Sequence, residues 1–463
     1  MTTRSESRWQ RSPAATAFAV AFLVFLVTAL LQGQKPFYYD SGAYWSLSES
    51  FVKAGHFSFL NFENTNLRGY GLPFVYFFVR NAGEFLGFAD ATSVAIFNAA
   101  LFAVIGAVLA PRLARVAVPS VEWGFGRRLL LCAILWIFWR GFLNYPLSDF
   151  VALALALLAL GVVGSSVSIP SFALVGGAAA LALDVRPAYF LLVPTVIALY
   201  LWRWYADDER RSPLWIARFG CLLAAVVLVS LPQSLSQHEN FGTWTPIPGG
   251  NGLVALQYTD GLILQRYDTY VGGPESQAQM NYVDRDGIRI LEGVENGVVK
   301  STGQYAKLVV EHPVQMAGVF IRHLVNGLDQ RYDTPYIEHL EGASNKVFRI
   351  AGFLIVFLAL VRLAWPRSRR RLAPISWRYL LALLLCSVSS VASAVETRFL
   401  LPVFLLATIL VILPGWTTPI GPPELGPRRY LPTVAIAAGA VVFFGVVAII
   451  VTGASDSLLF GHT

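Results

Sequence analysis

The chain has little charge and few cysteines. Only 14% of its 463 residues are charged and 56% are hydrophobic, whereas ordinary globular chains carry about 25% charged residues. Disordered chains have more charge, collagens have a glycine period, and disulfide-stapled modules have many cysteines, so these classes are excluded. The three cysteines, Cys132, Cys221 and Cys386, lie in apolar runs, where cysteine acts as a small hydrophobic residue. The composition indicates a membrane protein.

The sequence also lacks the usual motifs for nucleotides and metals. No Walker loop or dinucleotide-binding glycine pattern follows a strand-like run, and the six histidines form no i, i+4 pair. The basic residues lie beside apolar runs instead of forming an aromatic-interleaved basic face, which argues against a nucleic-acid partner.

Apolar runs long enough to cross a bilayer recur along the chain. A crossing helix needs roughly 20 apolar residues. Eleven stretches approach that length: 14–31, 93–111, 129–145, 148–165, 169–184, 187–203, 214–232, 347–364, 378–395, 398–414 and 430–452. No small-x-small cleavage site follows the first, so we expect an uncleaved span. The predicted fold class is an all-α polytopic membrane protein with about eleven transmembrane helices.

The short basic clusters predict how these helices are oriented. If the amino terminus is cytoplasmic, every such cluster lies on the cytoplasmic side, as the positive-inside rule requires. The stretch 71–88 carries Arg80 and Glu84, and a span there would invert the later loops. We therefore expect it to form an amphipathic juxtamembrane helix on the outer surface. The predicted location is a bacterial plasma (inner) membrane.

Three regions follow from this topology. Residues 1–232 form an amino-terminal transmembrane module that contains a long first outer loop, 32–92. Residues 233–346 form a partly helical outer (periplasmic) subdomain, with helices expected near 303–311 and 314–328. Residues 347–463 supply the carboxy-terminal transmembrane helices.

The first outer loop contains the strongest candidate for chemistry. Asp40 lies among aromatic residues that include Tyr39 and Tyr44, soon after the first span. One interpretation is that Asp40 caps a juxtamembrane helix. The other is a carboxylate beside aromatic rings, which suits stacking on a sugar and taking a proton from a hydroxyl. Burial near rings is expected to raise the pKa of this carboxyl and to make it a better base.

Two short hairpin turns each contain an acid-x-Arg tripeptide on the same outer side. These are Asp184-Val185-Arg186 and Glu396-Thr397-Arg398, and Asp149 begins another span on that side. Salt bridges and snorkelling at helix ends explain such residues without any function. A functional interpretation is that the arginines bind phosphate through paired hydrogen bonds.

The order of these features resembles the GT-C superfamily of membrane glycosyltransferases, in particular the branch with protein O-mannosyltransferases and the bacterial aminoarabinose transferase. The resemblance rests on the uncleaved first span, the aromatic-flanked Asp40, Gly55-His56, the run from Arg68 to Pro73, and the motifs Asn144-Tyr-Pro-Leu-Ser-Asp149, Asp184-Val-Arg-Pro187 and Glu396-Thr-Arg-Phe-Leu-Leu-Pro402.

The resemblance implies a hexosyl- or pentosyltransferase of cell-envelope glycan biosynthesis. It would move a sugar from a polyprenyl-phosphate donor, with inversion, to a glycan, lipid or protein acceptor on the outer face. By resemblance Asp40 is the catalytic base, and Arg186 and Arg398 bind the donor phosphate. The remaining substrate-binding candidates are Tyr39, Tyr44, Arg68, Asp149, Asp184, Glu396 and His56.

One departure from the family pattern concerns metals. Many relatives have a second acid beside the loop-one aspartate, whereas Ser41 and Gly42 follow Asp40. A single carboxylate provides too few oxygen ligands for a divalent cation, so we expect no metal and no cofactor. Three alternatives stay open: a transporter or flippase of a lipid-linked saccharide, a scaffold without catalysis, and a ligase for a longer glycan carried on a lipid diphosphate.

Overall fold

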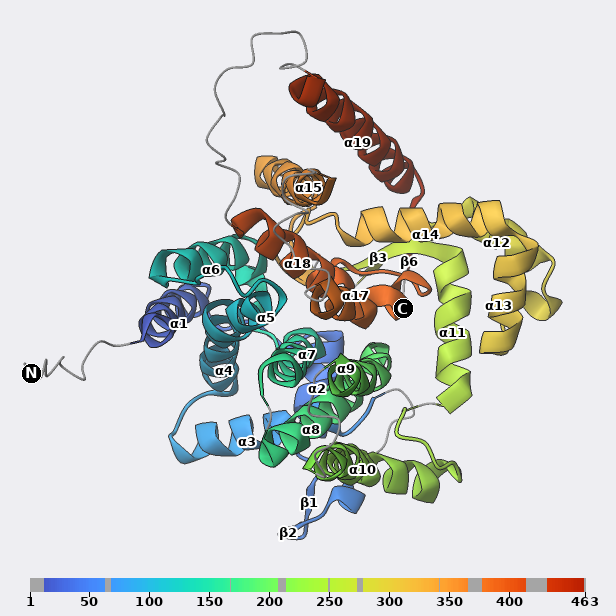
Figure 1. The fold of residues 1–463 in the computed structure, drawn as a ribbon. Coiled ribbons are helices and arrows are strands. Elements are labelled where there is room, and N and C mark those ends of the chain that lie inside the picture. The colour runs from blue at the N-terminus through green and yellow to red at the C-terminus, as the bar shows by residue number, and fades with distance from the viewer. Residues whose placement is uncertain are drawn as a thin grey trace, which may run out of the picture.

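The computed structural model describes residues 12–62, 68–166, 168–206, 214–248, 250–272, 278–340, 342–364, 377–413 and 431–461. Helices dominate the described residues (Figure 1). Seven helices are long and apolar enough to cross a membrane: Pro13–Leu31, Asp90–Ala117, Ser148–Ser165, Pro187–Ala206, Leu214–Phe241, Ala343–Ala364 and Ala435–Asp456. The chain is therefore a helical membrane protein, as its composition predicts.

These seven helices coincide with seven of the eleven predicted spans. The other four predicted spans fall on shorter helices: α6 (Phe125–Trp139), α8 (Ile169–Val185), α17 (Trp377–Val391) and α18 (Leu401–Ile412). A helix rises 1.5 Å per residue, so these helices reach about 18–26 Å of a hydrocarbon core that is about 30 Å thick. The count of eleven spans stays a prediction.

The first helix, α1 (Pro13–Leu31), shows how sequence sets these elements. The Ser12 hydroxyl accepts a hydrogen bond from the Ala15 amide at 3.2 Å, and Pro13 occupies the first turn, where a missing N–H costs nothing. Its buried residues recur every fourth position: Ala17, Ala21, Phe25 and Ala29. Small residues on this stripe allow close packing against α4 (Asp90–Val104).

The bundle is built around α7 (Ser148–Ser165), of which 14 of 18 residues are buried. Figure 1 looks nearly along α7, while α3 (Gly71–Phe85) runs across the view. The helix predicted at 71–88 is thus present, and α2 (Tyr39–Leu47) begins the loop before it. The remaining bundle elements are the π-helix Ile105–Leu109, α5 (Ala110–Ala117), α9 (Leu192–Ala206), α10 (Leu214–Phe241), α15 (Ala343–Ala364) and α19 (Leu431–Asp456).

The region 233–346 is only partly helical, and its strands were not predicted. Its helices are α11 (Gly250–Ile263), α12 (Arg285–Glu292), α13 (Thr302–Glu311) and α14 (Pro313–Gly327). The last two match the predicted helices. A sheet of order β5-β3-β4-β6 is formed by β3 (Leu264–Tyr270), β4 (Ala278–Val283), β5 (Tyr336–Ile337) and β6 (Leu458–Gly461).

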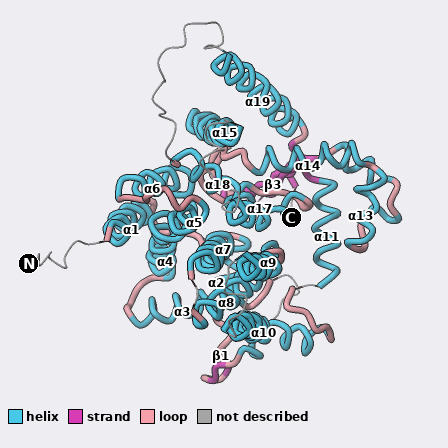
Figure 2. Tube along the Cα trace, viewed as in Figure 1, coloured by secondary structure: helices cyan, strands magenta, loops and turns pink. Residues whose placement is uncertain are grey.

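The strand β6 links the carboxy-terminal segment to the region 233–346. It pairs antiparallel with β4, so residues after the carboxy-terminal helices complete the four-stranded sheet, and the division at 346/347 stays a prediction. Figure 2 shows the strands gathered between α14 and α17. A second, two-stranded hairpin, β1 (Val52–Lys53) and β2 (His56–Phe57), lies in the first outer loop. Strands of two to seven residues give too short an alternation pattern to be recognised in an apolar sequence.

Candidate active site

Asp40 lies in the first turn of α2, and its carboxylate does not cap that helix. The N-cap position is Tyr38, which makes no side-chain capping bond. The next residue, Tyr39, has a positive φ of 40°, a left-handed conformation that costs a non-glycine residue about 1–2 kcal/mol. The Tyr336 hydroxyl accepts a hydrogen bond from the Ser41 amide at 3.2 Å and donates one to the Tyr38 carbonyl at 2.8 Å. These bonds hold the strained start of α2 in place.

The Asp40 carboxylate is bound by two arginines that are distant in sequence. One oxygen accepts a hydrogen bond from Arg68, and the other accepts one from Arg398 at 2.7 Å. Burial acts to raise the pKa of Asp40, but the charges of Arg398 and Arg68 outweigh it and lower the pKa to about 2. The expectation of a raised pKa is therefore wrong, and Asp40 is ionised at neutral pH while its side chain stays 34% exposed.

Arg398 connects Asp40 to two more acids. Its Nε and Nη2 atoms bind the two oxygens of Glu396 at 2.5 and 2.8 Å, and its Nη1 lies 3.6 Å from Asp149. Arg186 also pairs with Asp149, at 2.7 Å. Both guanidinium groups lie near the Phe399 ring, 4.3 Å from its centroid for Arg186 and 5.5 Å for Arg398. The two predicted acid-x-Arg turns thus meet beside Asp40.

Three carboxylates and three guanidiniums make up this ionic cluster: Asp40, Asp149, Glu396, Arg68, Arg186 and Arg398. The acids differ in environment, because burial raises the pKa of Glu396 despite Arg398, whereas the pKa of Asp40 is lowered. Carboxyl groups whose pKa values are pushed apart are typical of acid–base sites.

Asp184, a predicted substrate-binding residue, instead supports the segment that positions Arg68. A Cβ on Gly69 would lie 2.7 Å from the Asp184 carbonyl oxygen, and one on Gly71 would lie 2.8 Å from its carbonyl carbon. Tyr70 between them donates its N–H to Gln233 at 2.8 Å. The two glycines are therefore needed for close backbone contact with the end of α8.

The other predicted residues lie at different distances from the cluster. The Tyr44 ring centroid is 5.4 Å from the Arg68 guanidinium carbon, and burial together with Asp40 raises the pKa of the Tyr44 phenol. His56 is exposed in β2, and its carbonyl oxygen accepts a hydrogen bond from Asn61. The role of His56 at the site stays a prediction.

Sequence reasoning missed the contribution of β3. The Tyr267 amide donates to the Val395 carbonyl at 3.1 Å, and the Tyr267 side chain hydrogen-bonds to Glu396. The neighbouring Arg266 is buried, donates to Thr397 Oγ1 at 3.2 Å and binds both oxygens of Asp268. Strand β3 thus contacts the turn that contains Arg398 through Tyr267 and Arg266. The alternation Arg266-x-Asp268 is the only local signal for this strand.

Metal ligands do not gather at this site. Within the ranges that the structure describes, no group of three or more His, Cys, Asp or Glu side chains is placed to hold a metal ion. The arginines occupy the positions around Asp40 that a cation would need. That the reaction needs no metal stays a prediction.

Comparisons with known proteins give a distant likeness only. No protein-family model matches the chain, and no curated protein matches it. Among solved structures, the archaeal oligosaccharyltransferase AglB from Archaeoglobus fulgidus, in complex with an inhibitory peptide and a dolichol-phosphate, is similar with a TM-score of 0.45 and 12% identity. The match covers 97% of this chain and 56% of that one, so the chain spans a little over half its length. Function is therefore argued from the site itself.

Proposed function

We propose that this protein is an integral membrane glycosyltransferase that moves a hexosyl or pentosyl group from a polyprenyl-phosphate donor to a glycan, lipid or protein acceptor. The observation that supports the proposal is the ionised, partly exposed Asp40, held among arginines where membrane helices begin and end. A carboxylate can take the proton of an attacking hydroxyl, and arginines can hold a departing phosphate.

In the proposed reaction the acceptor hydroxyl loses its proton to Asp40 as its oxygen bonds to the anomeric carbon. The bond between that carbon and the phosphate oxygen breaks, and the electron pair leaves with the lipid phosphate. Attack from the face opposite the leaving group inverts the anomeric centre. Arg186 and Arg398 bind the phosphate, while Tyr39, Tyr44 and Arg68 border the sugar.

The arrangement suggests how donor binding activates the base. Arg398 divides its hydrogen bonds between Asp40 and Glu396. A phosphate that takes the Nη2 donor of Arg398 removes one of the two contacts that lower the pKa of Asp40 to about 2. The pKa then rises toward the ordinary value of 3.8, and the carboxylate becomes a stronger base only when the donor is present.

The proposal also specifies the side of the membrane on which the site lies. Asp40 follows the carboxyl end of α1, and Asp149 begins α7. The basic residues Arg112 and Arg115 lie within α5, toward the carboxyl end of the span Asp90–Ala117, and the positive-inside rule assigns that end to the cytoplasm. We place the site on the outer face of a bacterial plasma membrane, with a cytoplasmic amino terminus and no metal requirement.

The decisive test compares wild type, Asp40→Asn and Asp286→Asn in lipid nanodiscs. Asp286 is a matched control, because it is 38% exposed and pairs with Arg289 and Arg322 outside the cluster. Each protein is incubated with radiolabelled polyprenyl-phosphate monosaccharides and a crude extract of acceptor lipids and glycans. Loss of the base should slow transfer at least about 100-fold, while Asp286→Asn retains it.

Two results would overturn the proposal. Equal transfer by wild type and Asp40→Asn would remove Asp40 as the base. If no donor were consumed although all three folded proteins bound lipid-linked saccharide, the transferase would be abandoned for the transporter or flippase, and movement of labelled saccharide across proteoliposomes would be measured.

A further inference from the structure

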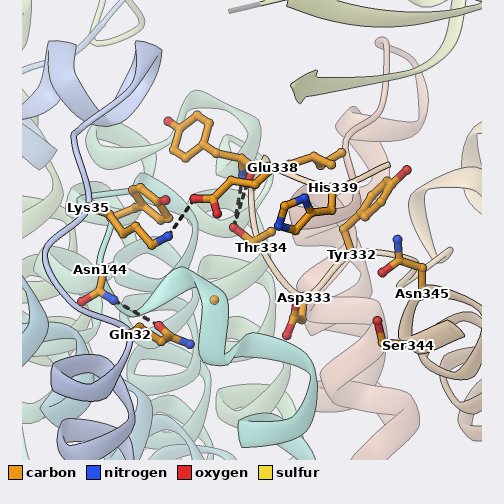
Figure 3. A pocket seen from close by; sticks show the side chains of 14 residues that line it. Gln32, Lys35, Asn144, Tyr332, Asp333, Thr334, Glu338, His339, Ser344 and Asn345 are labelled. Carbon is orange, nitrogen blue, oxygen red and sulfur yellow. Dashed lines mark hydrogen bonds and ion pairs between the residues drawn. The ribbon is translucent and has the colours of Figure 1, made fainter. Parts of the chain in front are cut away.

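Figure 3 shows a separate cavity, which has a volume of about 440 Å³. It is bordered by the end of α1 at Gln32, the turn before α7 at Asn144, the segment 332–339, and the start of α15 at Ser344 and Asn345. The lining residues come from three separated parts of the sequence, near residues 32–35, 141–145 and 332–345. None of these residues belongs to the ionic cluster around Asp40.

The segment 332–339 is firmly attached to the helix ends. Lys35 Nζ binds Glu338 at 2.8 Å, and Arg140 Nε binds Asp333 at 2.8 Å. The Gly141 amide donates to the Asp333 carbonyl at 3.0 Å, and a Cβ on Gly141 would lie only 2.3 Å from that oxygen. The cavity wall is therefore fixed, and the ammonium of Lys35 is neutralised by Glu338.

The lining groups match a neutral saccharide. The amides of Asn144 and Asn345 and the Ser344 hydroxyl are uncharged hydrogen-bonding groups. The Asn144 amide nitrogen donates to Ala29 and Gln32 and the Asn345 amide nitrogen to Leu340, so their carbonyl oxygens are the groups offered to a ligand hydroxyl. Tyr145, Tyr332 and Tyr336 also line the cavity, and aromatic rings suit the apolar faces of pyranose rings.

A neighbouring cavity of about 490 Å³ shows the contrasting chemistry. Asn345 lines both cavities, but the neighbour is bordered by three basic residues, Arg331, Lys346 and Arg349, of which Arg349 pairs with Asp329 at 2.9 Å. A phosphorylated ligand would favour that cationic lining, because arginine and lysine bind phosphate strongly. The first cavity has its lysine paired and is suited to hydroxyl groups instead.

Tyr336 links the first cavity to Asp40. Its ring packs on Tyr145 at a centroid distance of 4.7 Å, and its hydroxyl binds the backbone on both sides of Asp40, at Tyr38 and Ser41. We propose that the cavity binds a neutral saccharide part of the acceptor, next to the segment that contains the base. The role of this saccharide as the acceptor rests on the proposed function, whereas saccharide binding in the cavity does not. A glycan or glycolipid acceptor is thereby favoured over an unmodified peptide.

The experiment measures binding by saturation-transfer NMR on the full chain in lipid nanodiscs. The probes are neutral methyl glycosides and disaccharides, with glucose 6-phosphate as the charged comparison. Ser344→Trp fills the cavity at an exposed position near the start of α15, and Asn345→Ala removes one amide. Thr302→Trp is the matched control, because Thr302 is exposed at the start of α13, away from the cavity lining.

We expect at least one neutral probe to bind wild type, Thr302→Trp and Asp40→Asn alike. Ser344→Trp should weaken that binding at least about tenfold, and Asn345→Ala about fivefold. Equal binding to Ser344→Trp and wild type, binding of the phosphorylated probe alone, or no binding of any neutral probe would each overturn the saccharide site. Saccharide binding without any donor consumption would support the cavity and refute the transferase, so the two failures are distinguishable.

Discussion

Replacement of Arg398 by Met tests whether the ionic cluster holds the protein together. Arg398 is only 8% exposed and makes three hydrogen bonds to carboxylates, two to Glu396 and one to Asp40. The bond to Asp40 counts little, because that carboxylate is partly solvated and keeps Arg68. The two bonds to buried Glu396, at about 1.5–3 kcal/mol each, predict a loss of about 3–6 kcal/mol in the free energy of unfolding.

The assay is reversible SDS denaturation in mixed micelles, followed by circular dichroism. Arg80→Met is the control, because Arg80 pairs with the exposed acids Glu49 and Glu84, and such surface pairs contribute less than about 1 kcal/mol. The double variant Arg398→Met/Glu396→Gln should recover about half of the loss, since it leaves fewer unpaired buried carboxylates. If Arg398→Met were as stable as Arg80→Met, or if the double variant were less stable than the single one, the reasoning would be refuted.

Three further predictions concern the first outer loop and the reaction. Gly71→Ala should destabilise the protein by about 1–3 kcal/mol, because its Cβ would lie 2.8 Å from the Asp184 carbonyl carbon; Gly124→Ala, where a Cβ meets nothing within 4 Å, is the control, and equal melting temperatures would contradict the contact. The pKa of folded Asp40 is about 2 against an ordinary 3.8, so its ionised form contributes about 1 kcal/mol after solvent screening. This contribution is fully present above pH 4 and is lost as the pH falls toward 2; a stability difference between wild type and Asp40→Asn that stayed constant down to pH 2 would count against the arginine contacts. Transfer should be unchanged by EDTA, and loss of activity that Mg²⁺ or Mn²⁺ restores would show that a metal is required.

Much of the arrangement around Asp40 follows from hydropathy. The apolar runs predict the helices. The short turns between them predict that Asp149, Arg186 and Arg398 lie at helix ends, on the side where the first span ends. The structure brings these residues within ionic contact of one another or of Asp40. Helix ends that share one side of a bundle are close for simple geometric reasons, and this is why the grouping is predictable.

The rest depends on tertiary contacts that no local pattern specifies. The pKa of Asp40 falls because Arg68 and Arg398, 28 and 358 residues away, both reach its carboxylate. The contact of Tyr267 with Glu396 requires the register of β3 against the turn at Val395, which the sequence of a seven-residue strand does not determine. His56 was included because it is near Asp40 in sequence, and it lies in the β1–β2 hairpin, which the sequence did not predict.

The pairing of β6 with β4 has a consequence for the timing of synthesis. The strand β4 ends at Val283 and β6 ends at Gly461, so 461 − 283 = 178 residues separate the two edges. At roughly 5–20 residues per second, a ribosome takes on the order of ten seconds or more to make that stretch. Throughout this interval β4 has an open edge, and four later apolar helices, α15, α17, α18 and α19, must be made before the strand that covers it. The nascent protein therefore acquires its helix bundle first and closes its four-stranded sheet last.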